Sequence, residues 1–135
     1  MSSFTVKGDP IPQPRPRVYR NGGVGEDPRA TRHKQATIMA ARRARLPLLQ
    51  GEVELVVAYY RATTRRCDWD NLAKLTCDAL TGIAWRDDTQ IVSVHVLKCL
   101  DRVRPRTEVS IRAWSPIVVP VADWADAWDT TAANG

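Results

Sequence analysis

The sequence predicts an α+β domain in which two main helices pack against a small mixed β-sheet. The chain has 135 residues, which is about the size of one domain with a single hydrophobic core. Strand-like and helix-like segments follow one another in the order strands, helix, strand, helix, strand and strand. Hydrophobic residues make up 44% of the chain and charged residues 26%, and this ordinary globular usage excludes wholesale disorder.

The N-terminal segment is predicted to be extended. Phe4–Lys7 alternates apolar and polar side chains and precedes a Gly-Asp-Pro sequence, which predicts a strand followed by a turn. The proline-rich stretch that follows holds the backbone in an extended form, so that Arg15 and Arg17 project from a stiff strip. Another short strand is expected at residues 18–20, before the glycine-rich loop of residues 21–25.

The middle of the chain predicts a helix and then a buried strand. Residues 30–46 favour a helix with a strongly basic face, which ends at Pro47. That face fits a solvated surface at least as well as contact with DNA. The segment Glu52–Tyr60 carries apolar side chains on both sides, which is typical of a strand buried on both faces.

The next part of the chain predicts the second helix and the last strands. Asp70 or Asn71 is a good N-cap, and apolar residues then repeat at helical spacing as far as residue 82. Gln90–Leu97 is apolar and predicts a strand, and residues 106–113 alternate and predict a strand with one wet face.

Charge is distributed unevenly along the chain. The net charge is +5, and residues 1–50 contain ten Lys and Arg residues against three acids. A basic half on a small domain favours nucleic acid as the partner. Residues 115–135 contain three aspartates, two tryptophans and no basic residue. We therefore expect a domain of residues 1–114 followed by an acidic tail, which is either disordered or docks on a protein partner.

Other classes of protein are excluded by simple counts. The longest apolar run, Leu55 to Tyr60, is far too short to span a membrane, and the N-terminus has no hydrophobic signal core. We therefore expect a cytoplasmic protein without a membrane partner. The three cysteines form no Cys-x-x-Cys pair, so neither a disulfide framework nor a zinc site is expected.

Acidic residues gather between positions 65 and 90. Asp68 and Asp70 stand two apart where an extended segment enters a helix, and Asp87 and Asp88 precede a strand. Two carboxylates about 4 Å apart repel by about 4 kcal/mol at an effective dielectric near 20, and a divalent cation removes this repulsion. Oxygen ligands without His or Cys favour Mg²⁺ or Mn²⁺ over zinc.

Basic residues flank these acids. Lys74 lies one helical turn after Asp70, and Arg65 and Arg66 come just before Asp68. Such a mixture fits a phosphodiester substrate, which is anionic where the metal lies. The same residues also fit purely structural roles: Asp70 as a helix cap, Asp78 as an ion-pair partner of Lys74, and the Asp87-Asp88 pair as a solvated turn.

The acidic blocks and the proline strip resemble the RusA family of Holliday junction resolvases. The resemblance covers roughly residues 4–114, and several separated blocks occur in the family's order and spacing. The matching blocks are the Pro-x-Pro-Arg-Pro-Arg strip ending at Arg17, Asp68-x-Asp70-Asn71-Leu72-x-Lys74, Asp78-Ala79-Leu80-x-Gly82 and Asp87-Asp88-x-Gln90. The tail has no counterpart in this pattern.

This resemblance implies a RusA-like fold and a homodimeric, Mg²⁺-dependent endonuclease, with Mn²⁺ as a substitute. Such an enzyme cuts four-way DNA junctions during recombination and repair, and family members are often carried by phages and prophages. The family's metal ligands fall on Asp68, Asp70 and Asp88, and its catalytic lysine falls on Lys74. Supporting roles fall on Asp87, Asp78 and Asn71, and we expect Arg15, Arg17, Arg65 and Arg66 to contact the DNA backbone.

Two other interpretations remain open at this point. A non-catalytic nucleic-acid-binding protein explains the basic half, but it leaves the acids beside Arg65 and Arg66 unexplained because they would repel phosphate. An interaction module is the other alternative, with the tryptophans of the tail as its docking element, and it is compatible with nuclease activity.

Overall fold

The computed structural model confirms the α+β architecture and the expected order of elements. It describes residues 1–14, 17–18, 20–22, 24–25 and 27–115, so Arg15 and the tail of residues 116–135 lie outside the described residues. The elements are β1 (Ser2–Lys7), β2 (Arg17–Val18), β3 (Val24–Gly25), α1 (Pro28–Arg43), β4 (Val53–Arg61), α2 (Trp69–Leu80), the 3-10 helix η1 (Asp88–Gln90), β5 (Ile91–Leu100) and β6 (Arg106–Ala113).

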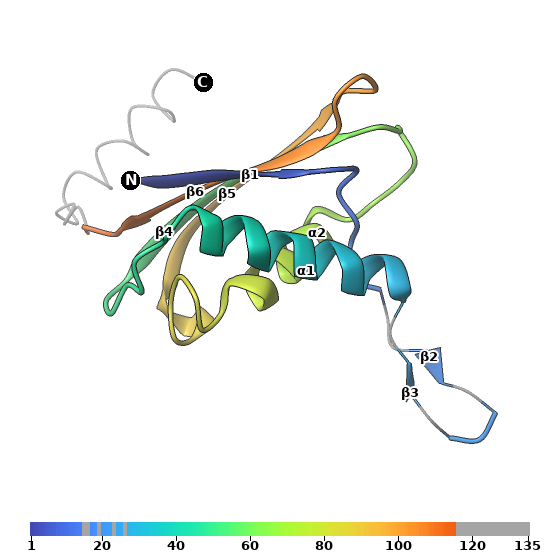
Figure 1. Cartoon of the computed structure of the whole chain (residues 1–135), viewed down its shortest axis with the longest axis horizontal. Coiled ribbons are helices and arrows are strands. Elements are labelled where there is room, and N and C mark those ends of the chain that lie inside the picture. The colour runs from blue at the N-terminus through green and yellow to red at the C-terminus, as the bar shows by residue number, and fades with distance from the viewer. Residues whose placement is uncertain (15–16, 19, 23, 26, 116–135) are drawn as a thin grey trace, which may run out of the picture.

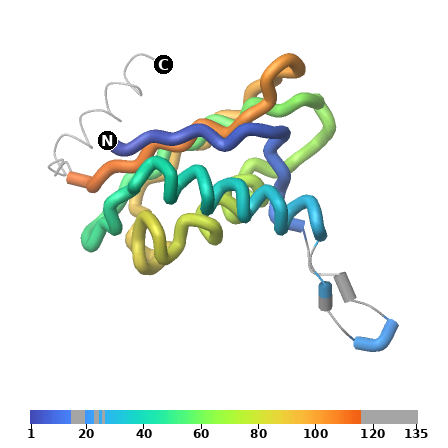
Figure 2. Tube along the Cα trace, in the orientation of Figure 1, coloured from blue at the N-terminus to red at the C-terminus, as the bar shows by residue number. Residues whose placement is uncertain are grey.

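Four of the strands form one mixed sheet, and both helices lie on the same side of it (Figure 1). The strand order is β1-β6-β4-β5, with β4 and β5 parallel and the other neighbours antiparallel. β2 and β3 pair separately as a short hairpin. The tube in Figure 2 shows the first strand running beside β6, where Ser2 is the register partner of Ile111.

The parallel pair determines where the functional side chains lie. β4 and β5 end together, because Tyr59 is the register partner of Lys98 and Arg61 is the partner of Leu100. The chain leaves β4 at this end and enters α2 after a short loop. Side chains at the carboxyl ends of both strands therefore lie near the start of α2.

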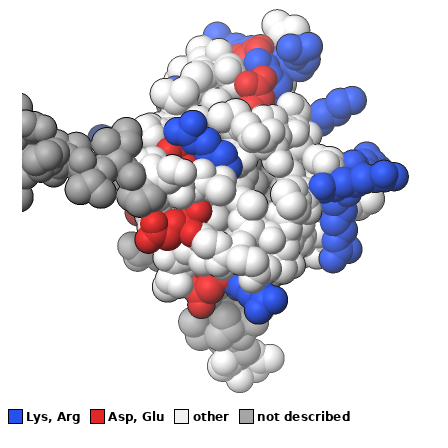
Figure 3. Space-filling view, turned by 90° about the vertical axis from the view of Figure 1, so that its left-hand side faces the viewer, with Lys and Arg blue, Asp and Glu red and all other residues white. Residues whose placement is uncertain are grey.

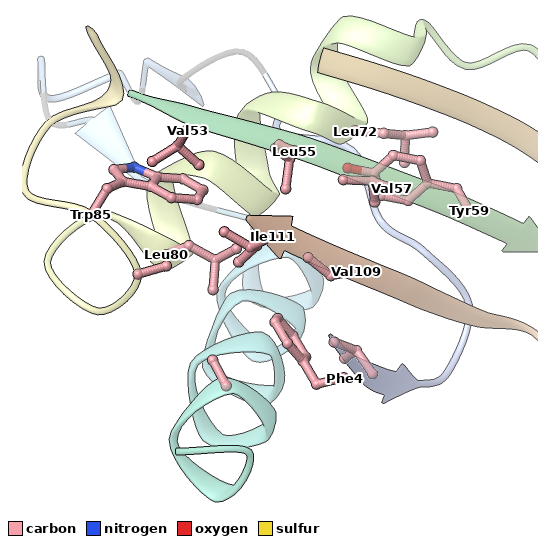
Figure 4. Packing of buried hydrophobic residues seen from close by; sticks show 13 residues of the cluster. Phe4, Val53, Leu55, Val57, Tyr59, Leu72, Leu80, Trp85, Val109 and Ile111 are labelled. Carbon is pink, nitrogen blue, oxygen red and sulfur yellow. The ribbon is translucent and has the colours of Figure 1, made fainter. Parts of the chain in front are cut away.

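The core fills the space between the sheet and the helices (Figure 4). β4 is buried on both faces, as predicted, because it is a central strand. Trp85 from the loop after α2 is completely buried, and its indole N–H donates to the hydroxyl of Thr81 at 3.2 Å. On the face of the sheet away from the helices, the buried carboxylate of Glu54 is neutralised by the guanidinium of Arg112 at 2.8 Å.

Some boundaries differ from the sequence-based prediction. α1 begins at Pro28, because the side chain of Asp27 accepts a hydrogen bond from the Arg29 amide and proline suits the first helical position. It ends at Arg43, and Arg45 then takes a left-handed conformation with φ of 54°, so the helix stops before Pro47. A short strand was expected at residues 18–20, and the structure has β2 at Arg17–Val18.

The largest difference concerns the strand predicted at Gln90–Leu97. Gln90 belongs to η1, and β5 continues to Leu100. β5 is an edge strand, and four of its apolar side chains are about half exposed: Val92 at 47%, Val94 at 46%, Leu97 at 57% and Leu100 at 49%.

Candidate active site

α2 presents a charged face to solvent because its apolar face is fixed in the core. Its buried side chains recur at helical spacing and include Leu72, Leu75 and Ala79. The hydroxyls of Tyr59 on β4 and Thr76 on α2 form a buried hydrogen bond of 2.7 Å. Burial raises the pKa of Tyr59, so this phenol stays neutral and holds the helix against the sheet.

The exposed face of α2 carries three of the predicted site residues in one stripe. Asp70, Lys74 and Asp78 follow one another at intervals of four residues, with Asp70 and Lys74 exposed and Asp78 partly exposed. The salt bridges among the described residues do not include Lys74, so its ammonium is not neutralised by Asp78 as the structural alternative supposed.

The helix cap is Asp68, and the expectation of Asp70 or Asn71 was wrong. Asp68 has extended backbone angles, and its carbonyl accepts the first helical hydrogen bond, from the Leu72 amide at 3.3 Å. Its side chain makes no capping hydrogen bond and is exposed. Asp70 lies inside the first turn, where its carboxylate accepts from the Asn71 amide at 3.0 Å. Both carboxylates therefore stand at the start of α2.

The second acidic pair consists of a capping aspartate and an exposed neighbour that also contacts it. Asp87 caps η1, and its carboxylate accepts from the Thr89 amide at 2.9 Å. This hydrogen bond from the Thr89 backbone lowers the pKa of Asp87. Gln90 closes the turn by accepting from the Asp87 amide at 3.0 Å. Asp88 is exposed in the first turn of η1.

Asp88 lies at the far end of the α2 stripe. The charges of Asp78 and Asp88 both act on the thiol of Cys77, whose pKa is raised to about 11, chiefly by burial. Cys77 is seven residues beyond Asp70, which corresponds to about 10 Å along a helix axis. Among residues 1–14, 17–18, 20–22, 24–25 and 27–115, no three His, Cys, Asp or Glu side chains converge closely enough to hold a metal ion.

The carboxylates still fit a hard cation in their chemistry. Asp68 and Asp70 offer only oxygen ligands, and Mg²⁺ is commonly bound by one or two carboxylates together with water and substrate phosphate. A cage of three protein ligands is therefore not required for this ion. Cys67 lies beside Asp68, but its thiol donates to the Asp68 carbonyl at 3.8 Å, and burial raises its pKa, which disfavours the thiolate that zinc binds.

The proline strip lies against this helix start. The Gln13 amide donates to the Asn71 carbonyl at 2.9 Å. Pro12, Gln13 and Pro14 line one side of a surface pocket, and Arg66, Asp68 and Asn71 line the other. Asn71 therefore joins the strip to α2 through its backbone. Arg15 falls outside the described residues, and of Arg17 only the backbone pairing in β2 is described.

Basic side chains border the acids on the other side. Arg65 and Arg66 are exposed in the loop between β4 and α2 and share a second pocket with Asp68. Arg61 and Lys98 line the same pocket, and the sequence prediction missed both. Their signal is weak in the sequence, because they belong to different strands and meet only through the parallel pairing of β4 and β5.

The wider surface carries further basic groups. α1 exposes several arginines, among them Arg29 and Arg43. Figure 3 shows Lys and Arg side chains gathered along the right-hand side of the face it presents, with Asp and Glu in separate small patches. No helix within the described residues is long and apolar enough to cross a membrane.

Comparisons with known proteins identify the family of the chain. The family described as Endodeoxyribonuclease RusA matches residues 7–112, which include β4, α2, η1 and β5. A protein of Bacillus subtilis (strain 168), called "Uncharacterized protein YqaN", is 31% identical over 134 residues, covering 81% of this chain and 94% of that relative. The chain belongs to the RusA endodeoxyribonuclease family, and the resemblance stated from the sequence is confirmed.

Proposed function

We propose that this protein is a Mg²⁺-dependent endonuclease that resolves four-way DNA junctions by paired nicks. Membership of the RusA family supports the nuclease class and the branched substrate. The observation that carries the proposal is the group of Asp68, Asp70 and Lys74, three charged side chains that are exposed near the start of α2 and that no salt bridge among the described residues neutralises.

Each of these residues has a distinct role in the proposal. Asp68 and Asp70 would hold the cation at the start of α2. Asp88, the third metal ligand in the family's pattern, lies at the other end of α2 and does not converge with them among the described residues. A bound Mg²⁺ supplies an activated water and stabilises charge on the leaving oxygen. Lys74 contacts the scissile phosphate and offsets the negative charge that develops during cleavage. Arg15, Arg17, Arg65 and Arg66 hold the backbone of the junction and position it without reading its sequence.

The test uses the full chain and a labelled synthetic four-way junction, with and without Mg²⁺. We expect paired nicks near the crossover with the metal, and none on a linear duplex of the same sequence. The variant Asp70→Asn, which keeps the side-chain size, should bind the junction and leave it uncut. Tight binding without cutting by the unmodified protein, in Mg²⁺ and in Mn²⁺, would instead identify a binding protein.

A homodimer is part of the proposal, because two matched nicks require two equivalent sites related by a two-fold axis. The edge strand β5 supports it. A long edge strand with half-exposed valines and leucines is normally covered in a native protein, and a second copy of the same strand is a suitable cover. Sedimentation equilibrium measures the mass, and a monomer at micromolar concentration would contradict this part of the proposal.

The salt dependence of binding gives a further check. If a dimer neutralises six to ten phosphates, affinity for the junction should fall by about 10³–10⁵ between 50 and 200 mM salt.

The acidic tail is assigned to a protein partner in the same proposal. Deleting residues 115–135 should then leave junction cleavage unchanged and abolish partner binding, whereas tighter DNA binding after deletion would indicate self-inhibition instead.

A further inference from the structure

We propose that the pocket between Arg61, Arg65 and Lys98 binds a phosphate of the cleaved strand beside the scissile one. This inference rests on the proposed function, because it requires DNA at Asp68. It adds Arg61 and Lys98 to the DNA-binding residues and gives Arg65 a defined place at the DNA backbone. The pocket has a volume of about 540 Å³, which accommodates a phosphodiester group together with its waters.

The charge of the pocket selects an anion. Four basic side chains line it, and Asp68 is the one acidic residue among its lining residues: Arg61, Thr64, Arg65, Arg66, Cys67, Asp68 and Lys98. Guanidinium groups match the geometry of phosphate oxygens, and an ammonium adds a point charge. Asp68 stands at the rim that leads to the α2 stripe, so an anion in this pocket lies next to the proposed catalytic residues.

Arg61 has a donor that the protein does not use. Its side chain is partly buried, and one terminal nitrogen donates to the Arg65 carbonyl at 2.7 Å. The Nε of the same guanidinium is buried without a hydrogen-bond partner among the described residues. A buried N–H without a partner is unfavourable, and a small shift of the Arg61 side chain toward an anion in the pocket would give it an acceptor.

The loop that forms the pocket is held in place before any ligand arrives. Its start is fixed by the Ala62 amide, which donates to the Asp9 carboxylate at 2.8 Å. Its end is fixed by the Lys98 ammonium, which donates to the Cys67 carbonyl at 2.8 Å. The hydrogen bond from Arg61 to the Arg65 carbonyl holds the middle of the loop. Such preorganisation lowers the entropic cost of binding.

The experiment measures binding of the four-way junction by fluorescence anisotropy in EDTA, where no cutting occurs. Lys98→Gln removes the charge and keeps a side-chain donor, and we expect it to weaken binding about tenfold, as for one charge-assisted hydrogen bond. The magnitude of the salt slope should fall by about 0.9 for each phosphate that the variant no longer neutralises. Lys98→Arg should retain affinity. The matched control Arg43→Gln removes the charge of an exposed arginine at the end of α1, which does not line the pocket. It should change affinity less than twofold.

The second arm places single methylphosphonates, which carry no charge, at each phosphate near the cut. At one position beside the cut, we expect the neutral group to weaken binding of the unmodified protein about tenfold and to have almost no further effect on Lys98→Gln. This non-additivity identifies the phosphate that the pocket binds. If Lys98→Gln fails to fold, Arg65→Gln takes its place, because the Arg65 side chain is exposed.

Two results would overturn the inference. Equal losses for Lys98→Gln and Arg43→Gln, or no loss for either, would show that the charge is not acting locally. Additivity with every methylphosphonate would show that the pocket faces away from the strand. Failure of the proposed function is distinguishable, because the unmodified protein would then leave the junction uncut whether or not it binds it, whereas failure of this inference alone leaves both binding and cutting intact.

Discussion

Two aspartates occupy the same position, the N-cap of a helix, and differ in how their side chains are used. Asp87 precedes η1 and accepts a hydrogen bond from the helix it caps. Asp68 precedes α2 and makes no such bond. N-cap residues normally satisfy one of the free amides of the first turn. A carboxylate left out of a capping bond keeps its oxygens for a ligand.

The largest expected effect is on the rate of junction cleavage, when the charge of each capping aspartate is removed in turn. Asp68→Asn should lower the rate of junction cleavage by about 10²–10³-fold, the loss seen when one group that stabilises developing charge is removed. Asp87→Asn should cut at nearly the rate of the unmodified protein, because asparagine is an equally good cap. Single-turnover cleavage in Mg²⁺ measures both. Equal losses of cleavage rate in the two variants would show that the two aspartates do not differ in function.

A smaller effect is expected at Gln90, which fixes the loop that carries Asp88. Its carbonyl oxygen accepts from the Arg86 and Asp87 amides, and its amide group donates to the Leu49 and Gly51 carbonyls. Because these four bonds are partly solvent-exposed, Gln90→Ala should lower the free energy of unfolding by about 2 kcal/mol.

Urea denaturation measures this change, and Gln50→Ala serves as the control because Gln50 is an exposed glutamine in the same loop region. A stability loss of the same size in both variants would show that the Gln90 bonds do not hold the loop. Unchanged stability in Gln90→Ala would lead to the same conclusion.

The smallest effect is the stability contributed by the caps themselves. Asp87→Ala should lower Tm by a few degrees at pH 7, whereas Asp68→Ala should leave Tm nearly unchanged. The pKa of Asp87 is lowered in the folded protein, so its stabilisation is present above the unfolded pKa of about 3.9 and is lost as pH falls through the folded value. The Tm difference for Asp87→Ala should therefore vanish in acid, which calorimetry from pH 7 to pH 2 will test.

Local patterns were sufficient to predict the elements and the residues of α2. The order of strands and helices follows from periodicity, and Asp70 and Lys74 share a helix face whatever the tertiary structure. The cap was predicted at the wrong residue, because Asp68, Asp70 and Asn71 are all good N-caps and packing decides among them. An apolar strand also has the same pattern in the centre and at the edge of a sheet, so the exposure of β5 was not predictable.

The rest of the site depends on contacts that are distant in the sequence. Lys98 joins the loop after β4 through the Cys67 carbonyl, 31 residues away. Gln13 joins α2 through the Asn71 carbonyl. Neither contact leaves a periodic signal in the sequence, because each depends on how separate segments are arranged after folding.

The pairing of the first strand has a consequence for how the protein is made. β1 pairs with β6, and Ser2 is the register partner of Ile111 and Lys7 that of Arg106. During synthesis, β1 emerges long before β6, its neighbour in the sheet. The two strands can therefore pair along their full length only after residue 111 has left the ribosome. Contacts of such long range fold slowly. A nascent chain therefore carries α2, with Asp70 and Lys74, well before the sheet that supports this helix is finished, and nuclease activity should arise after translation of the domain rather than during it.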